Sequence, residues 1–238
     1  MGLTIHYQLK ATARGIKAAR QLVGQLRQRA LDLPFKEVGP LTELAGDACD
    51  FQKRPKADSC RWMLVQAMGS VQRKPYSYSF PPRQVIAFDT RPGDGCEAAN
   101  FGLCLYPGRI DIEDRDVWPY RKRRLCTGLS GWSWSSFCKT QYASSSDCGG
   151  VENFLRCHLL VIRMLDHARN LGILQSVSDE GDYWQKRDLK ALAQEVGEWN
   201  EMIAAEAGRL KDLLGPDLQA PILQFPDFEH LEAAGRDR

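Results

Sequence analysis

The sequence lacks every complete motif that would identify a chemistry directly. Its 238 residues contain no Cys-x-x-Cys pair, no complete catalytic or nucleotide-binding motif, and only four histidines. Closely spaced cysteine pairs are the usual source of zinc ligands, and imidazole is the commonest general base. The spacing therefore excludes a zinc knuckle, and few residues are available for imidazole-dependent catalysis.

The chain also lacks a long apolar run, a secretory signal and a strong net charge. No stretch approaches the roughly 18 apolar residues that span a bilayer, and the N-terminus has neither the basic nor the apolar region of a signal peptide. Its 32 basic and 30 acidic residues leave a formal net charge of +2. Such a charge gives no general attraction to nucleic acid or anionic lipid. We predict a soluble cytoplasmic protein without a membrane partner.

Cysteine, in contrast, is abundant, with eight residues in the chain. An even number would suit disulfides in a secreted protein, but the missing signal favours reduced thiols that are mostly buried as small apolar residues. A structural zinc site assembled from separate strands remains an open but less favoured alternative. Its ligands would come from Cys96, Cys104, Cys126, Cys138, Cys148, Cys157 and His158.

The periodicity of apolar residues predicts an α+β fold. Strands are expected at 3–9, at 35–44 with a break at Gly39-Pro40, at 62–68, 85–88 and 101–105, and within 126–142. Helices are expected at 13–31, at 150–170 and over most of the stretch 189–213. The order makes an N-terminal β-α-β unit. We predict a mainly antiparallel sheet covered by the N-terminal helix and the two long C-terminal helices.

The end of the chain differs from the rest. Residues 1–215 show no internal linker and are predicted to form one domain. Residues 216–238 contain three prolines at five-residue intervals, which forbid a continuous helix, so this tail is either docked or partly disordered. The apolar spacing of the last long helix is broken only by Glu206. That heptad-like pattern would allow dimerisation, and packing on the protein's own sheet explains it equally well.

The stretch 89–107 is the least ordinary part of the sequence. It contains three glycines, two prolines, two cysteines and an asparagine within nineteen positions, and such shaped loops often carry function. Gly93 and Gly95 partly match a dinucleotide fingerprint, but the nearby acidic side chains oppose a phosphate and the next strand follows too soon. We expect Gly93, Gly95 and Asn100 to shape a ligand pocket rather than a phosphate cradle.

An enzyme is the alternative hypothesis. Cys96 follows a glycine where a short helix would lower its pKa, and His6, on the polar face of the first strand, is the freest candidate base, with Glu97 to orient it. Asp179 and Glu180 could serve as acid and base or bind a divalent ion, although capping of a helix would alone account for them. The reaction class would be hydrolysis or group transfer.

Two further surfaces are candidates for binding. Lys139 and Gln141 share a strand face and, with Tyr142, would line a pocket beside the 89–107 loop. A basic run with nearby tryptophans could hold phosphates and stack bases; it consists of Arg121, Lys122, Arg123 and Arg124. The acidic cluster just before this run favours a hairpin whose two arms pair opposite charges.

These features favour a non-catalytic cytoplasmic protein. Its binding surface is predicted to combine the 89–107 loop with the aromatic segment 130–142, and its partner to be a small ligand or a protein. Nucleic acid is a less favoured partner. The sequence identifies no cofactor.

Overall fold

The computed structural model describes residues 3–12, 15–114, 121–215 and 217–237. Its strands are β1 (Thr4–Ala11), β2 (Glu37–Val38), β3 (Thr42–Ala45), β4 (Gly69–Arg73), β5 (Tyr76–Phe80), β6 (Gln84–Arg91), β7 (Ala99–Leu105), β8 (Arg109–Asp114), β9 (Arg121–Cys126), β10 (Trp132–Lys139) and β11 (Leu174–Asp179). The helices are α1 (Ile16–Leu31), α2 (Arg61–Gln66), α3 (Gly150–Asn170), α4 (Tyr183–Lys186), α5 (Leu189–Leu214) and α6 (Phe228–Arg236). Short 3-10 turns are η1 (Gly46–Cys49), η2 (Phe51–Lys53), η3 (Gln141–Ser144), η4 (Ser146–Cys148) and η5 (Pro221–Gln224).

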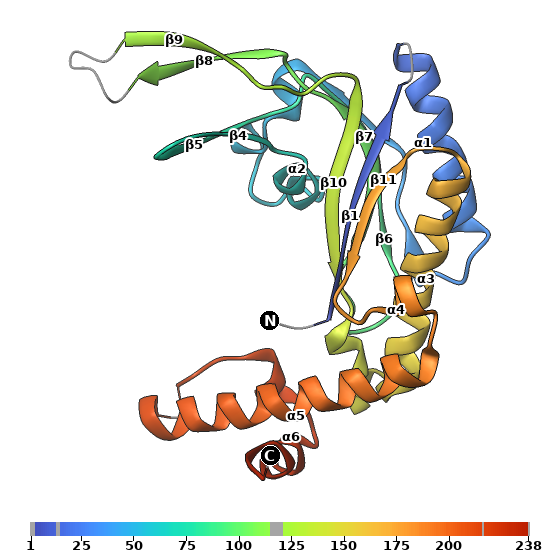
Figure 1. Cartoon of the computed structure of the whole chain (residues 1–238), viewed down its shortest axis with the longest axis vertical. Helices are drawn as coiled ribbons and strands as arrows, with labels where there is room; N and C mark the ends of the chain where they lie inside the picture. Colours follow the sequence, from blue (N-terminus) through green and yellow to red (C-terminus); the bar gives the residue numbers. More distant parts are fainter. Residues whose placement is uncertain (1–2, 13–14, 115–120, 216, 238) are drawn as a thin grey trace.

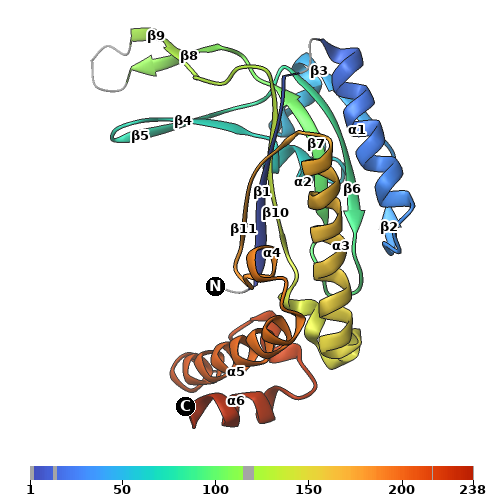
Figure 2. The same ribbon diagram turned by 45° about the vertical axis from the view of Figure 1, so that its right-hand side comes forward.

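A seven-stranded antiparallel sheet is the centre of the fold. Its strand order is β11-β1-β10-β7-β6-β2, and β3 pairs with β6 beside β2. The α+β class with a mainly antiparallel sheet is confirmed. Helices α1 and α3 lie against one face of the sheet (Figures 1 and 2), where alternate residues of β1 are buried because the strand turns every second side chain towards the helices. Among the described residues, no helix is both long and apolar enough to cross a bilayer.

The opposite face is open over β1, β10 and β11. Two hairpins, β4–β5 and β8–β9, project from the upper end of the sheet, and α5 with α6 projects from the lower end (Figure 1). Helix α3 covers the sheet as expected, whereas α5 extends away from it with α6 and η5 packed along it. The molecule therefore has the outline of a C whose back is the sheet.

One local prediction was wrong, and two others are made more precise. Residues 62–68, expected as a strand, form α2, since Met63, Leu64 and Ala67 are buried together on one side of a helix. A short apolar run has no periodicity that separates a buried strand from a buried helix. The strand expected at 35–44 is divided at Gly39-Pro40, as predicted, into β2 and β3. Of the two alternatives for the tail, the structure shows the docked one: it forms η5 and α6, and Ile222, Phe225 and Phe228 build a small apolar cluster on α5.

Candidate functional site

The open face of the sheet is polar along three neighbouring strands. His6 and Gln8 of β1 lie opposite Ser178 and Ser176 of β11, and Ser135 of β10 lies opposite Gln8 on the other side. Strand alternation places these side chains on the face away from α1 and α3, so they do not pack in the core. Their combined surface is an array of hydroxyl, amide and imidazole groups.

Two adjoining cavities lie on this face. The first, which we call the His6 cavity, has a volume of about 340 Å³ and is lined by His6, Tyr7, Gln8, Gln66, Ser135, Ser136, Phe137, Ser176, Val177 and Ser178. The second, the Lys10 cavity, has a volume of about 390 Å³; its polar lining includes Gln8, Lys10, Gln66, Ser70, Tyr106, Ser130, Ser133, Ser135 and Gln175. Each is large enough for a small ligand. Because both share Gln8, Gln66 and Ser135, they form one continuous polar surface.

The charge of this surface is one-sided. Among the described residues that line the two cavities, Lys10 and His6 are the groups that carry or can gain positive charge, and neither Asp nor Glu occurs. The whole chain has 30 acidic residues, and the described lining contains none of them. A cation therefore finds no carboxylate here, and an anionic ligand meets no repulsive carboxylate.

Gln66 of α2 is held in place where the two cavities meet. Its Oε1 accepts hydrogen bonds from Asn100 Nδ2 at 2.8 Å and from Ser136 Oγ at 2.7 Å. With the oxygen fixed by two donors, the amide nitrogen of Gln66 is turned towards other acceptors. Asn100 itself is buried, and its Oδ1 has no hydrogen-bond partner, which is rare for a buried acceptor.

The sheet opens beside Gln66. Strands β10 and β7 pair at Trp132↔Leu105 and Ser133↔Cys104. Farther along β7, the Asn100 carbonyl oxygen accepts hydrogen bonds from side chains. Tyr7 Oη donates to it at 2.6 Å and Trp134 Nε1 at 2.9 Å. Burial raises the pKa of the Tyr7 hydroxyl, so it acts as a fixed donor. These bonds join β1 and β10 to β7 beyond the last paired residues of the β10–β7 ladder.

Aromatic rings border the site. Phe137 is 40% exposed and its ring centroid lies 5.8 Å from that of His6. Trp62 is 76% exposed and precedes Gln66 by one helical turn of α2, which places both side chains on the same side of that helix. Exposed rings of this kind provide flat apolar contact beside the polar groups.

The 92–98 loop lies away from these cavities and is packed into the body. A Cβ at Gly93 would meet Cys157 Sγ at 2.6 Å, and one at Gly95, whose φ is +70°, would meet the Tyr142 carbonyl oxygen at 2.5 Å. Both glycines are therefore required by close approach to α3 and η3. Asn153 Nδ2 donates to the carbonyl oxygens of Asp94 and Ala143, each at 3.0 Å, and fixes the loop from the helix side.

Cys96 is surrounded by other thiols and backbone. Its Sγ lies 3.7 Å from Cys138 Sγ and 3.8 Å from the Lys139 carbonyl oxygen. The neighbouring Cys138, together with burial and the Glu97 charge, raises the pKa of the Cys96 thiol far above its usual range. Glu97 Oε2 accepts from the Lys139 backbone N–H at 3.1 Å. A protonated thiol is a weak nucleophile, and His6 lies in the cavities rather than beside it.

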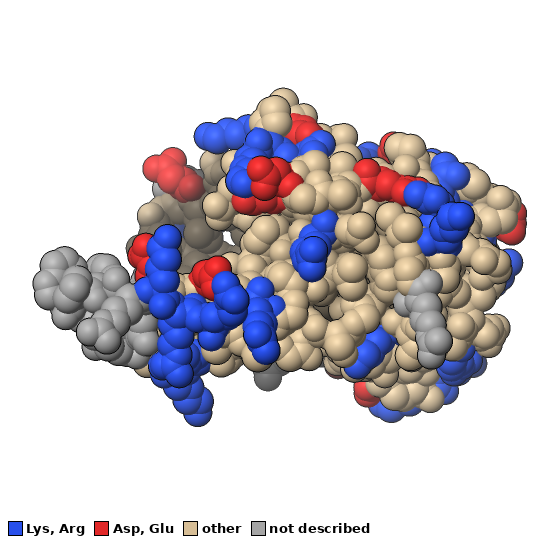
Figure 3. All heavy atoms as spheres, turned by 90° about the horizontal axis from the view of Figure 1, so that it is seen from above, with Lys and Arg blue, Asp and Glu red and all other residues tan. Residues whose placement is uncertain are grey.

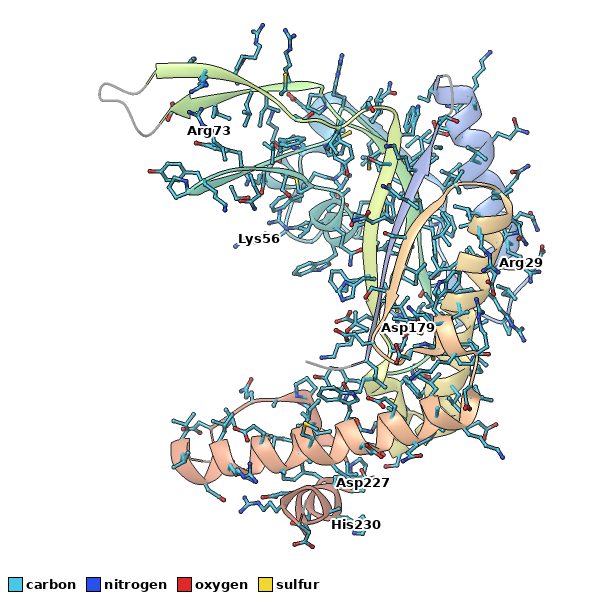
Figure 4. The ribbon with its side chains drawn as sticks, in the orientation of Figure 1. Arg29, Lys56, Arg73, Asp179, Asp227 and His230 are labelled. Atoms are coloured by element: carbon cyan, nitrogen blue, oxygen red, sulfur yellow. The ribbon has the colours of Figure 1, made fainter. Side chains whose placement is uncertain are left out.

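Asp179 belongs to a fully buried chain of hydrogen bonds. Its Oδ2 contacts His158 Nε2 at 3.2 Å, and His158 Nδ1 contacts Thr140 Oγ1 at 3.1 Å. Burial acts to raise the pKa of Asp179, but the His158 contact and the amides of Trp184 and Gly181 outweigh it, and the pKa lies below its usual range. Figure 4 shows Asp179 at the lower end of β11, between the sheet and the helices. The order Asp, His, Thr resembles a catalytic triad, yet all three side chains are buried.

The other predicted site residues have separate structural partners. Glu180 Oε2 accepts from the Thr4 backbone N–H at 2.9 Å. Lys139 Nζ lies 4.6 Å from the ring centre of Tyr142, and the buried Gln141 donates through Nε2 to Asn200 Oδ1 at 2.9 Å. His158 is fully buried in the core.

The basic run lies on the β8–β9 hairpin. Lys122 is paired across the strands with Glu113, and Arg124 with Asp111, at an Arg124 Nε to Asp111 Oδ1 distance of 3.0 Å. Figure 3 shows Lys and Arg gathered over this hairpin with acidic side chains next to them. The hairpin with opposed charges is therefore confirmed, and much of its positive field is neutralised locally. Arg121 occupies β9, but its side chain lies outside the described set.

No metal centre is evident in the part of the chain that the structure describes. Within residues 3–12, 15–114, 121–215 and 217–237, no group of three or more His, Cys, Asp or Glu side chains is arranged to hold a metal ion. Cys96, Cys138 and Cys157 lie close together, but as free thiols within the core.

Of the residues singled out in the sequence, His6 lines the His6 cavity and Asn100 contacts Gln66, whereas most of the lining was not singled out. Gln8, Ser135 and Ser176 were hidden in ordinary strand alternation, and Gln66 in a run taken for a strand. One available signal was the four serines Ser133, Ser135, Ser176 and Ser178 at alternate strand positions. Comparison of the chain with protein-family models, curated proteins and solved structures gave no match.

Proposed function

We propose that this protein is a non-catalytic binding protein whose ligand occupies the joined His6 and Lys10 cavities. The observation that carries the proposal is a polar lining that excludes carboxylates while presenting hydroxyl and amide groups at strand spacing. Segment 130–142 contributes to this surface through β10. The 89–107 stretch contributes indirectly, through the bond from Asn100 to Gln66.

The lining supports a ligand that is neutral or anionic and rich in hydrogen-bonding groups. Serine is not among the residues that stabilise strands, so four serines facing solvent on β10 and β11 do little for the sheet. Rows of hydroxyls match a ligand with several donors and acceptors, and the Phe137 ring offers a flat contact for its apolar side. A small polar molecule or a segment of a protein chain fits this description.

Reduced thiols support a cytoplasmic site of action. All eight cysteines are free, and Cys96 and Cys138 remain unbonded at an Sγ–Sγ distance of 3.7 Å. Thiols stay reduced in the cytosol, whereas an oxidising compartment favours disulfides. We therefore place the ligand in the cytoplasm in this proposal.

Ligand-observed NMR with a panel of sugars, nucleosides, nucleotides and amino-acid amides would test the proposal. We expect binders among the neutral and anionic probes, and weaker binding by Gln66→Leu and Ser135→Val. Each substitution removes one or two hydrogen bonds worth about 1 kcal/mol apiece, or about fivefold in affinity per bond. Valine suits a strand, so Ser135→Val preserves the sheet.

Ser79→Val is the matched control, because Ser79 is an exposed serine on β5 and lines neither cavity. It should bind every probe as the unaltered protein does. Binding that survives both cavity substitutions, or a panel in which only cationic probes bind, would refute the proposal.

A further inference from the structure

Helix α5 is covered on two sides and bare on a third. Helix α6 packs where Gly208 and Gly235 allow close approach, and η5 covers Ala204 and Ala207 through Ile222. The remaining side carries large apolar residues that stay in solvent. Met202 is 52% exposed, Leu210 39% and Leu213 80%.

This bare side is the floor of a groove of about 610 Å³ between α6 and η5. Its floor is formed by Trp199, Met202, Glu206, Arg209 and Leu210, and its walls include Pro221 and Gly235. Most of the residues that line the groove are apolar. A contiguous exposed apolar surface of this kind marks an interaction site. Figures 1 and 2 show α5 extending beyond the sheet, so a partner helix could approach it.

The residues of this side are spaced as a coiled-coil seam. Met202, Glu206, Arg209 and Leu213 follow one another at intervals of four, three and four residues, which is the alternation of a and d positions. The pattern is also symmetric, with an apolar residue at each end and opposite charges in the middle. When this helix pairs with an identical antiparallel helix, each charged residue faces the opposite charge and each apolar residue faces an apolar residue.

We propose that α5 pairs with α5 of a second copy of this chain, antiparallel, about a two-fold axis between residues 207 and 208. Glu206 of each copy then faces Arg209 of the other, and Met202 faces Leu213. The interface is isologous, so each favourable contact occurs twice. Within one chain Arg209 Nη1 already lies 3.3 Å from Glu206 Oε2, and in the dimer both groups form a shared four-charge layer.

The two charges select this arrangement over others. A parallel pair would place Glu206 against Glu206 and Arg209 against Arg209, both repulsive. A purely apolar partner helix would cover the Glu206–Arg209 ion pair without supplying an opposite charge to either group. A second copy supplies the opposite charge at each position and an apolar residue at each end of the seam.

Charge reversal in the full chain tests the pairing by analytical ultracentrifugation. The unaltered protein should show a concentration-dependent dimer. Glu206→Arg alone sets arginine against Arg209, and Arg209→Glu alone sets glutamate against Glu206, so each should weaken self-association at least tenfold. An equimolar mixture of the two variants should recover the dimer, because in the mixed dimer each residue 206 again faces an opposite charge at residue 209 of the other chain. The double variant Glu206→Arg/Arg209→Glu should also self-associate.

Two further measurements make the test decisive. Lys211→Glu makes the same charge reversal as Arg209→Glu, but on a side of α5 outside the groove, and should leave the dimer intact. A dimer bridged by oxidation between Met202→Cys and Leu213→Cys chains, but not between two Met202→Cys chains, would support the antiparallel register. A monomer at all concentrations, or a mixture of single variants that does not recover association, would overturn the proposal.

Discussion

Removal of the Asp179 carboxylate should destabilise the fold rather than abolish a reaction. The carboxylate accepts three contacts inside the protein: the Gly181 N–H at 3.0 Å, the Trp184 N–H at 2.8 Å and the His158 Nε2 at 3.2 Å. Asp179→Ala leaves two backbone donors and an imidazole nitrogen buried without this partner. Removing one member of such a buried pair costs about 3–5 kcal/mol, and we expect a loss in that range.

Urea denaturation at pH 7, followed by tryptophan fluorescence, measures this loss. Asp47→Ala is the control, since Asp47 makes an exposed ion pair with Lys53 at 2.8 Å and should change stability by about 0–1 kcal/mol. Asp179→Asn keeps the shape and one acceptor, and should fall between the two. A loss for Asp179→Ala no larger than that of Asp47→Ala would refute the structural role.

The same pair predicts a pH dependence with a definite sign. Because the folded-state pKa of Asp179 is depressed, its stabilisation is complete above the unfolded value of about 3.9 and is lost as pH falls through the lower folded value. The stability difference between the unaltered protein and Asp179→Ala should thus be constant near neutral pH and shrink in strong acid. A difference that grows on acidification would contradict the depressed pKa.

Three further outcomes are expected. At neutral pH, Cys96 in the native protein should react with iodoacetamide far more slowly than the exposed Cys126, because its pKa is raised; equal labelling by mass spectrometry would reject a buried Cys96 thiol. Tyr7→Phe should reduce the free energy of unfolding by about 1 kcal/mol through loss of one buried hydrogen bond, and an unchanged urea midpoint would contradict that bond. Gly235→Ala places a methyl group against the α5 backbone, and should cost about 1–3 kcal/mol in the same assay; no loss would show that α6 does not pack so closely.

Periodicity succeeded where one face of an element is buried and one exposed. The alternation in β1 and the helical spacing of α3 each reflect burial against the core on one side, so sequence alone located both. The charges of the β8–β9 hairpin predicted its pairing for the same local reason. Helix α2 was missed because six residues with several apolar side chains satisfy a strand and a helix equally.

The candidate cavities could not be predicted from local pattern. They require β11 to lie beside β1, although these strands are separated by most of the chain, and they require α2 to bring Gln66 over β10. The 89–107 stretch shows why an unusual local sequence does not by itself identify a binding loop. Its glycines are unusual because α3 and η3 approach them closely, and a packing constraint produces the same local signature as a binding loop.

The two proposals depend on separate parts of the molecule and can fail separately. The joined cavities are lined from β1, β10, β11 and α2, whereas the groove is lined mainly from α5 and η5, and the two linings share no residue. If α5 pairs as proposed, the contact involves the helix at the lower end of the sheet (Figure 1). Charge reversal at Glu206 should therefore weaken dimerisation at least tenfold without changing affinity for a cavity ligand. A ligand whose affinity falls with Glu206→Arg as steeply as with Ser135→Val would mean that the site is completed by the second copy.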